Sequence, residues 1–301
     1  MNDVKKNLQG VFSPMCTPFL KSGELDMAGL EKNIEIMNKS GLKGYFILGT
    51  NGEYKTLSED ERIRIIKSTV AKAGYDKIVM AGTGFESTLE TIRHTKIAAG
   101  LGVITVSLLM PNFFAKKITA DAMIRHIIAV ADSSPVPVLL YNNPSVAAGV
   151  TITPEVIDTV SRHENVAGIK DSSKETWPEI VKYDSDNFSV LAGSAGYFFD
   201  LFDRGGTGGV LSLANVFPEA CARLYNLYRE KKMAEAAELN NKLIDLNKKI
   251  SGSYGVAGVK YAMDIAGFTG GDPRMPLPAL NGEARDKIRA DLAASGFIRQ
   301  D

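Results

Sequence analysis

Short apolar runs alternate with longer amphipathic stretches along the whole chain. The short runs are nearly all continuously apolar, which is typical of parallel strands covered on both faces, and the longer stretches have the periodicity of helices. Because no long linker or low-complexity segment interrupts this alternation, it predicts an α/β fold. The predicted strands are residues 11–19, 44–49, 78–83, 103–109, 136–142, 166–171, 189–193 and 209–214.

Start signals for helices follow several of these runs. Ser58 is followed three residues later by Glu61, which is the pattern of a capping box. Thr119 and Thr153 also precede helical patterns, and the proline after Thr153 suits the first turn of a helix. These local signals agree with a helix after each strand.

Eight strands that are each followed by a helix predict a (β/α)8 TIM barrel, a fold that takes up about 250 residues. Beyond residue 231 the pattern is helical only, over residues 233–250, 256–266 and 283–295. We therefore predict a barrel over residues 1–231 and a C-terminal helical extension, residues 232–301, packed on the barrel. A doubly wound open sheet is the alternative, which is less favoured because no Gly-x-Gly-x-x-Gly motif opens a helix after an early strand.

The composition indicates which kinds of binding partner and which cellular compartment are expected. Lys and Arg together number 35, as do Asp and Glu, so the formal net charge is zero and neither nucleic acid nor an anionic membrane is an expected partner. The two cysteines, Cys16 and Cys221, form no Cys-x-x-Cys pair, which suits a reducing compartment. The polar N-terminal stretch and the lack of a long uncharged apolar run predict a cytoplasmic protein.

The chain has three histidines, His94, His126 and His163, and all lie in segments with helical patterning. None is close in sequence to another histidine or to a cluster of carboxylates, so no metal site is expected. We expect the three side chains on helix surfaces and at helix ends.

Lys170 is a single lysine near the end of the apolar run 166–171. A lysine in apolar surroundings loses solvation of its ammonium form, so its pKa falls and more of it is the free amine, which is a nucleophile toward ketones. This position suggests an enzyme that forms a Schiff base through Lys170. The alternative is a lysine that closes a strand and points into water.

Three other predicted strands end in segments with polar groups, and the active site of a (β/α)8 barrel lies at the carboxyl ends of its strands. Residues 49–53 offer a hydroxyl, an amide and backbone N–H groups suited to a small carboxylate, although the same residues are typical of an ordinary turn. Tyr141 is either a proton-transferring phenol or a buried structural tyrosine. With residues 193–196, these segments are expected to surround one cavity with Lys170. Such a set suits a 2-oxo acid aldolase.

Several motifs occur in an order that matches a known family. They are Gly-Thr-x-Gly-Glu at 49–53, Tyr-Asn-x-Pro at 141–144, Gly-Ile-Lys-Asp-Ser at 168–172 and Ala-Gly-Ser at 192–194. Thr-Pro-Phe at 17–19 and Arg-Met-Pro at 274–276 extend the match over nearly the whole chain. In this order they resemble the dihydrodipicolinate synthase/N-acetylneuraminate lyase family of class I pyruvate aldolases.

The resemblance implies that Lys170 forms the Schiff base and that Tyr141 shuttles protons. It implies that Thr50, with the neighbouring amides, holds the carboxylate of the 2-oxo acid and takes part in the proton relay. A (β/α)8 barrel with a helical extension, a homotetramer or dimer, no metal or organic cofactor, and pyruvate or another 2-oxo acid plus an aldehyde as substrates are also implied. The further residues expected to contact substrate are Gly49, Asn51, Gly52, Ser172, Gly193, Ser194, Val146 and Phe114.

The chain departs from the synthases of this family at three places. Asn51 stands where the synthases repeat threonine, and Gly-x-Asn-Gly-Glu is similar to 4-hydroxy-2-oxoglutarate aldolases. Val146 stands where the synthases carry an arginine that grips the carboxylate of aspartate semialdehyde, and valine cannot replace a bidentate cation. Phe113 and Phe114 lie where many members carry a relay tyrosine, and neither has a hydroxyl.

These departures favour a lyase that cleaves a 4-hydroxy-2-oxo acid of the 4-hydroxy-2-oxoglutarate or 2-keto-3-deoxy sugar acid type. Phe113, Phe114 and Val146 suggest an acceptor pocket less polar than that of the synthases. One alternative is dihydrodipicolinate synthase itself, which condenses pyruvate with aspartate semialdehyde in lysine biosynthesis. Another is a barrel that binds 2-oxo acids without turning them over.

Overall fold

The apolar runs form a closed barrel of eight strands in sequence order. The computed structural model describes residues 3–298. Parallel pairing and helices between consecutive strands confirm the predicted (β/α)8 architecture. The strands are β1 (Gly10–Ser13), β2 (Gly44–Ile47), β3 (Ile78–Gly82), β4 (Thr105–Leu109), β5 (Val138–Asn142), β6 (Val166–Asp171), β7 (Ser189–Ala192) and β8 (Gly208–Val210).

The helices begin where the sequence signals placed them. Ser58 and Glu61 form the predicted capping box, and the Thr119 side chain accepts a hydrogen bond from the first turn of its helix. Thr153 precedes a helix that starts with proline, but its side chain makes no capping bond. The α-helices are α1 (Asp3–Leu8), α2 (Met27–Asn38), α3 (Glu59–Lys72), α4 (Thr88–Gly100), α5 (Ala120–Ser133), α6 (Pro154–Val160), α7 (Trp177–Ile180), α8 (Phe198–Asp203), α9 (Pro218–Arg229), α10 (Met233–Asn247), α11 (Ser253–Ile265) and α12 (Gly282–Ala294).

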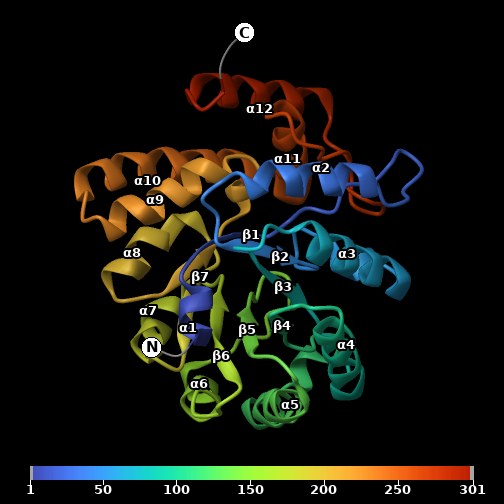
Figure 1. Cartoon of the computed structure of the whole chain (residues 1–301), viewed down its shortest axis with the longest axis vertical. Helices are drawn as coiled ribbons and strands as arrows, with labels where there is room; N and C mark the ends of the chain where they lie inside the picture. Colours follow the sequence, from blue (N-terminus) through green and yellow to red (C-terminus); the bar gives the residue numbers. More distant parts are fainter. Residues whose placement is uncertain (1–2, 299–301) are drawn as a thin grey trace. The chain divides into compact units, whose positions relative to one another are not determined.

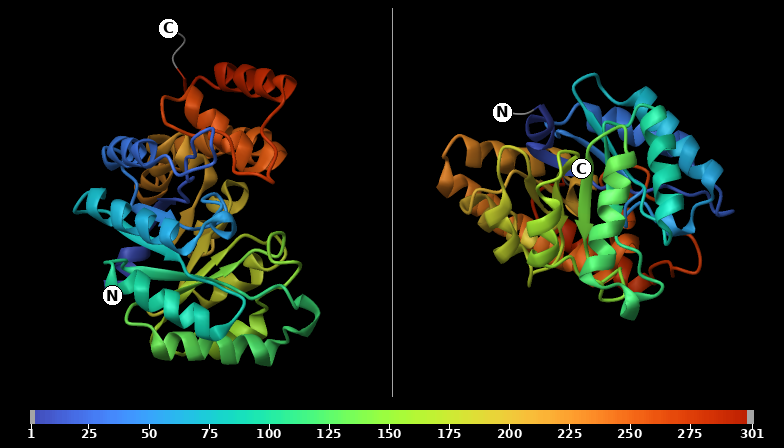
Figure 2. Two further views of the ribbon diagram at one scale, coloured as in Figure 1. Left: turned by 90° about the vertical axis from the view of Figure 1, so that its right-hand side faces the viewer. Right: turned by 90° about the horizontal axis from the view of Figure 1, so that it is seen from below.

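The chain forms two compact units, each made of two segments. Residues 3–10 and 78–210 form the first unit, in which α4 and α5 lie side by side on the outside of the sheet (Figures 1 and 2). Residues 11–77 and 211–298 form the second unit, in which α10 packs against α9 and α12 against α11. The division into a barrel of residues 1–231 and an extension of residues 232–301 stays a prediction.

Most strands are one or two residues shorter than predicted, and the first and last differ most from the prediction. The run 11–19 is a strand only to Ser13, because Pro14 and Pro18 have no N–H to donate to a neighbouring strand. The run 209–214 leaves the sheet after Val210 and forms a 3₁₀ turn over Ser212–Asn215. The helix α1 at the N-terminal end was not predicted from the sequence.

The expectation that all histidines lie on helix surfaces or at helix ends is wrong for two of them. His94 and His126 are buried, at 8% and 6% exposure. The His94 ring stacks on Phe85 with 4.0 Å between ring centroids, and His126 Nδ1 lies 2.9 Å from Thr88 Oγ1. Burial lowers the pKa of His126 to about 4, so this imidazole is neutral at pH 7. His163 lies just beyond α6, as expected, with Nε2 3.0 Å from Asp132.

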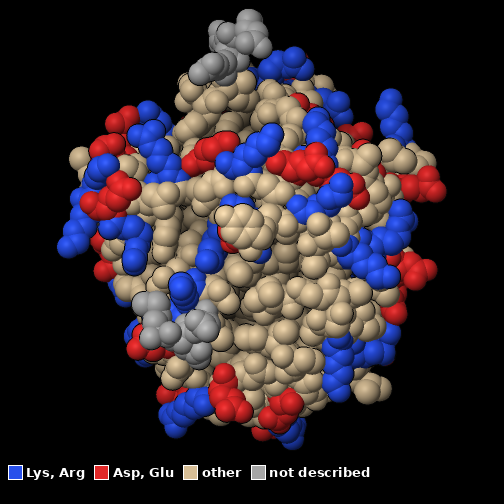
Figure 3. Space-filling model, viewed as in Figure 1, with Lys and Arg blue, Asp and Glu red and all other residues tan. Residues whose placement is uncertain are grey.

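The surface carries charges of both signs. On the face shown in Figure 3, Lys and Arg side chains are interspersed with Asp and Glu side chains. Among residues 3–298, no helix combines the length and the apolar character needed to cross a membrane. Within the same residues, no group of three or more His, Cys, Asp or Glu side chains could hold a metal ion.

A β-bulge at Ala167 sets the register between β5 and β6. Val138 pairs with Val166, but Leu139 pairs with Gly168, so one residue of β6 is left without a partner on β5. Gly168 has φ +151°, and a Cβ there would collide with the backbone of Ser189 on β7. Only glycine suits this position, where the backbone of β7 comes close.

We expect Gly168→Ala to lower the free energy of unfolding by at least about 2 kcal/mol, because the added methyl group meets backbone atoms of β7 at a positive φ. Urea unfolding followed by circular dichroism measures this change. Gly100→Ala is the matched control, since Gly100 ends α4 and its methyl group would meet no atom of another element within 4 Å. This control should leave stability unchanged or slightly raised. Equal stabilities of the two variants would contradict the importance of the bulge.

Candidate active site

Lys170 lies on β6 and is buried, with 4% of its surface exposed. Burial lowers the pKa of its ammonium group, and the neighbouring Tyr141 only partly opposes this effect. The interpretation of Lys170 as a strand-end lysine pointing into water is therefore wrong. A lysine that loses its proton more readily supplies the free amine that attacks a carbonyl carbon.

Tyr141 is the direct neighbour of Lys170 across the sheet. The two residues are register partners on β5 and β6, so their side chains lie on the same face. The ammonium nitrogen of Lys170 lies 3.9 Å from the centre of the Tyr141 ring. Asn143 donates a hydrogen bond of 2.8 Å to the Tyr141 hydroxyl. A phenol and an amine are thus held side by side at the end of two strands.

The opposite face of the same two strands carries a second polar group. Asp171 accepts hydrogen bonds from Thr176 Oγ1 at 2.7 Å, from the Ser173 N–H at 2.9 Å and from Asn142 Nδ2 at 3.0 Å. Burial raises the pKa of Asp171 to about 6, and these bonds oppose the shift. The side-chain oxygen of Asn142 in turn accepts from the Ile152 N–H. This network fastens β5 to β6 behind the Lys170–Tyr141 pair.

The sequence did not single out Asn142 or Asp171 as functional residues, although each directly follows a predicted catalytic residue. Strand alternation places them on the face opposite to Tyr141 and Lys170. The sequence signal that could have identified Asn142 and Asp171 was a polar residue at the end of each of two apolar runs.

Ser172 and Gly193, two of the residues expected to contact substrate, lie close to the end of β6. The Gly193 N–H donates to the Asp171 carbonyl oxygen at 2.6 Å, and a Cβ on Gly193 would collide with the Ser172 hydroxyl. Ser194 instead accepts a hydrogen bond from the Gly196 N–H and so caps a 3₁₀ turn, Ala195–Tyr197. A contact of any of these residues with substrate stays a prediction.

Phe114 and Val146 lie in the segments that follow β4 and β5. Phe113 and Phe114 are exposed and meet edge to face, with 4.9 Å between ring centroids. The Glu86 carboxylate accepts the N–H groups of Asn112 and Phe113 and so anchors this segment. Val146 is 41% exposed. These apolar side chains supply no cation for a second carboxylate.

The segment 49–53 belongs to the second unit and forms a tight loop after β2. Its backbone closes through a hydrogen bond of 3.0 Å from the Glu53 N–H to the Thr50 carbonyl oxygen. The Thr17 hydroxyl also stabilises the loop by donating a hydrogen bond of 2.8 Å to the Gly52 carbonyl oxygen. A Cβ on Gly49 would lie 2.9 Å from the Phe46 ring, so this position favours glycine.

Asn51 Nδ2 is a buried donor that has no hydrogen-bond partner among the residues that the structure describes. An unsatisfied buried N–H is costly, so such a group needs an explanation. A ligand that brings an acceptor oxygen to this loop would satisfy it. That residues 49–53 bind the carboxylate of a small acid stays a prediction.

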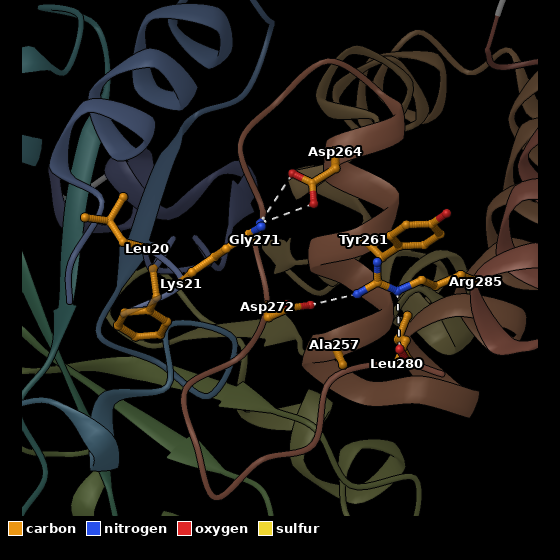
Figure 4. A pocket seen from close by; sticks show the side chains of 10 residues that line it. Leu20, Lys21, Ala257, Tyr261, Asp264, Gly271, Asp272, Leu280 and Arg285 are labelled. Atoms are coloured by element: carbon orange, nitrogen blue, oxygen red, sulfur yellow. Dashed lines mark hydrogen bonds and ion pairs between the residues drawn. The ribbon is translucent and has the colours of Figure 1, made fainter. Parts of the chain in front are cut away.

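The second unit also contains a cavity of about 200 Å³ (Figure 4). None of the predicted site residues lines it, so it is separate from the candidate catalytic groups. Its lining residues are Phe19, Leu20, Lys21, Ala257, Tyr261, Asp264, Gly271, Asp272, Leu280 and Arg285.

Comparison with known proteins agrees with these observations. Residues 7–295 match the model of the Dihydrodipicolinate synthetase family. A 4-hydroxy-tetrahydrodipicolinate synthase from Methanococcus aeolicus is 32% identical over 97% of this chain and 100% of its own length. A protein of Emericella nidulans described as a probable mitochondrial 4-hydroxy-2-oxoglutarate aldolase is 32% identical over 95% of this chain and 94% of its own length.

A solved structure of a related protein has the same fold. The crystal structure of a chloride-inhibited dihydrodipicolinate synthase from Acinetobacter baumannii, complexed with pyruvate, superposes with a TM-score of 0.91. The two chains are 29% identical, and the match covers 97% of this chain and 100% of the other.

We expect Lys170→Met to raise the free energy of unfolding at pH 7 by about 1 kcal/mol or more, because it removes a buried charge and keeps the apolar stem. The folded-state pKa of Lys170 lies below 10.5, so the cost of the charge is full below that pKa, falls as the pH rises and vanishes above about 10.5. The gain should therefore shrink as the pH approaches 10.5.

Urea unfolding at several pH values tests this prediction. Lys174→Met is the matched control, since Lys174 is exposed four residues further along the chain, and it should leave stability unchanged. A Lys170→Met protein that is less stable than the wild type at pH 7 would show that the ammonium group is well solvated or well paired.

Proposed function

The chain belongs to the Dihydrodipicolinate synthetase family, and from this premise we propose that it is a pyruvate-dependent aldolase that cleaves a 4-hydroxy-2-oxo acid. Members of this family are lyases that act through a Schiff base. The observation that carries the proposal is the buried amine of Lys170, with its lowered pKa, beside the phenol of Tyr141. An amine and a proton carrier held together are the minimum required for Schiff-base chemistry.

In the proposed reaction the Lys170 amine attacks the keto carbon of the 2-oxo acid. Tyr141 moves the protons that allow water to leave, and a protonated imine forms between Lys170 and the substrate. This cation accepts the electron pair of the C3–C4 bond when that bond breaks, while the 4-hydroxyl gives up its proton and becomes the carbonyl of the released aldehyde. The remaining enamine takes a proton at C3, and water hydrolyses the imine to release pyruvate and the free amine.

We propose that the loop 49–53 binds the carboxylate next to the keto group. Thr50 would hold one carboxylate oxygen and join the proton relay with Tyr141, and the Asn51 amide would bind an oxygen with its unsatisfied N–H. The rule that supports this assignment is general: residues after the carboxyl ends of barrel strands form the active site of this fold. Gly49 and Gly52 would leave the loop backbone open to the carboxylate.

The acceptor half of the substrate is proposed from Val146, Phe114 and Asn51. Val146 cannot grip a second carboxylate, which argues against aspartate semialdehyde as the partner of pyruvate. The synthase reaction is the second candidate, because relatives with that name match the chain over nearly its whole length. We also propose a homotetramer or dimer, on the family resemblance alone.

Sodium borohydride with pyruvate is expected to leave a reduced adduct on Lys170, detected by intact-mass analysis and peptide mapping. Lys170→Met should give no adduct. If the adduct is absent in the wild type or lies on another lysine such as Lys260, the proposed mechanism is wrong.

Pyruvate release from a panel of 4-hydroxy-2-oxo acids, run beside condensation with aspartate semialdehyde, then identifies the reaction. An adduct without turnover of any substrate would indicate a binding protein.

Val146→Arg is expected to raise kcat/KM for condensation of pyruvate with aspartate semialdehyde by about tenfold, which is ~1.4 kcal/mol. Val146 is partly exposed, so the longer side chain should not disturb the fold. Ser145→Arg is the control, because it adds the same charge one residue away at an exposed position. Strong condensation by the wild type would overturn our interpretation of Val146.

A further inference from the structure

A fully buried ion pair joins the loop 49–53 to the C-terminal helices. Glu53 Oε1 and Lys260 Nζ lie 2.7 Å apart, and both side chains have no exposed surface. Removing two charges from water is costly, and apolar residues of similar volume often stabilise a core as well or better. The pair therefore calls for an explanation other than stability, and the hydrogen bonds around it supply one.

Both carboxylate oxygens of Glu53 are bound by the C-terminal part of the chain. Oε1 is bound by Lys260 of α11, and Oε2 accepts the N–H of Arg274 at 2.8 Å. Glu53 itself has a left-handed backbone, with φ +53°, which is unfavourable for a residue with a side chain. The loop is thus held in a strained shape at its last residue by two groups from the far end of the sequence.

Arg274 holds the chain just beyond the loop. Its guanidinium forms a forked ion pair with Glu61 at 2.6 and 2.9 Å and donates to the Thr56 carbonyl oxygen at 2.9 Å. Lys260 and Arg274 both lie over the ring of Phe19, at 4.4 and 4.3 Å from its centre. The segment from Glu53 to Glu61 is therefore fixed at both of its ends.

The linker that carries Arg274 is itself fastened to the helices on either side (Figure 4). The Asp264 carboxylate at the end of α11 accepts the N–H groups of Gly270 and Gly271. Arg285 of α12 pairs with Asp272 at 3.0 Å. These contacts make the linker a rigid support rather than a loose connection between two helices.

We infer that Glu53 and Lys260 are positioning residues for the carboxylate of the 2-oxo acid. They hold the loop so that Thr50 and Asn51 present their donors, and each neutralises the other so that no unpaired charge lies behind the loop. The inference rests on the proposed function, since it takes the loop as the carboxylate site. If Lys260 is replaced by an uncharged residue, Glu53 loses its counter-ion and the loop loses one of the two groups that hold it.

The test compares a keto acid with an uncharged ketone. Borohydride trapping on Lys170 is measured with pyruvate and with hydroxyacetone for the wild type, Glu53→Gln, Lys260→Met and the double variant Glu53→Gln/Lys260→Met. We expect the trapping rate with pyruvate to fall at least tenfold in all three variants, and the rate with hydroxyacetone to stay within about twofold. In the double variant, which has no unpaired charge, Tm should recover relative to Lys260→Met while the preference for pyruvate stays lost.

Lys77→Met is the matched control. Lys77 is another buried lysine of the same unit, and its ammonium group donates to the Ser40 and Leu42 carbonyl oxygens at 2.9 Å. Its loss should lower Tm and leave the ratio of the two trapping rates unchanged. This control separates a general loss of stability from a specific effect on the carboxylate.

The outcomes are distinct. Wild-type preference for pyruvate in folded Glu53→Gln, Lys260→Met or the double variant would overturn the inference. If none of the three folds, the pair is structural and the inference also fails. If the wild type traps neither carbonyl compound on Lys170, the proposed function itself is wrong.

Discussion

The register of β6 against β5 is the constraint on which the candidate chemistry depends. Side chains alternate along a strand, so a shift of one residue would turn Lys170 to the opposite face. The bulge at Ala167 and the close approach of Gly168 to β7 fix this register. The Asn142–Asp171 hydrogen bond then fastens the same two strands from behind. The amine of Lys170 and the phenol of Tyr141 lie on the same face of the sheet because the backbone fixes this register.

Burial gives this arrangement its reactivity and its cost. The surroundings that lower the pKa of Lys170 also disfavour its charged form in the folded state. A site of this kind trades stability for a lysine that gives up its proton more readily. The fold tolerates the cost because a closed parallel sheet supplies many other buried apolar contacts.

The sequence predicted the parts of the structure that have local signals. Continuous apolar runs located the eight strands, and capping residues such as Ser58 located helix starts. Prolines shortened β1 against the apolar pattern. Tertiary contacts buried two histidines that were expected on helix surfaces or at helix ends: His94 stacks on Phe85, and His126 lies beside Thr88 of α4. In these cases a tertiary or backbone constraint overrode a correct local pattern.

In the candidate site too, some residues have a local signal in the sequence and others depend on contacts between distant segments. Lys170 stood out because one lysine at the end of an apolar run is rare, and its burial agrees with that signal. The roles of Lys260 and Arg274 could not be predicted, because each acts on a residue more than 200 positions earlier and no local pattern records such a pairing. The sequence shows that Asn142 and Asp171 are polar residues at strand ends, but only the pairing of β5 with β6 shows that they bind each other.

The ion pair between Glu53 and Lys260 also spans far more of the chain than the Lys170–Tyr141 pair does. Its two members are 207 residues apart, whereas every residue of the Lys170–Tyr141 pair and of its supporting network lies within residues 141–176. Contacts that are local in sequence form before those that close long loops. A chain that ends before residue 260 would therefore contain every residue of the Lys170–Tyr141 pair and its network, but would lack the counter-ion of Glu53.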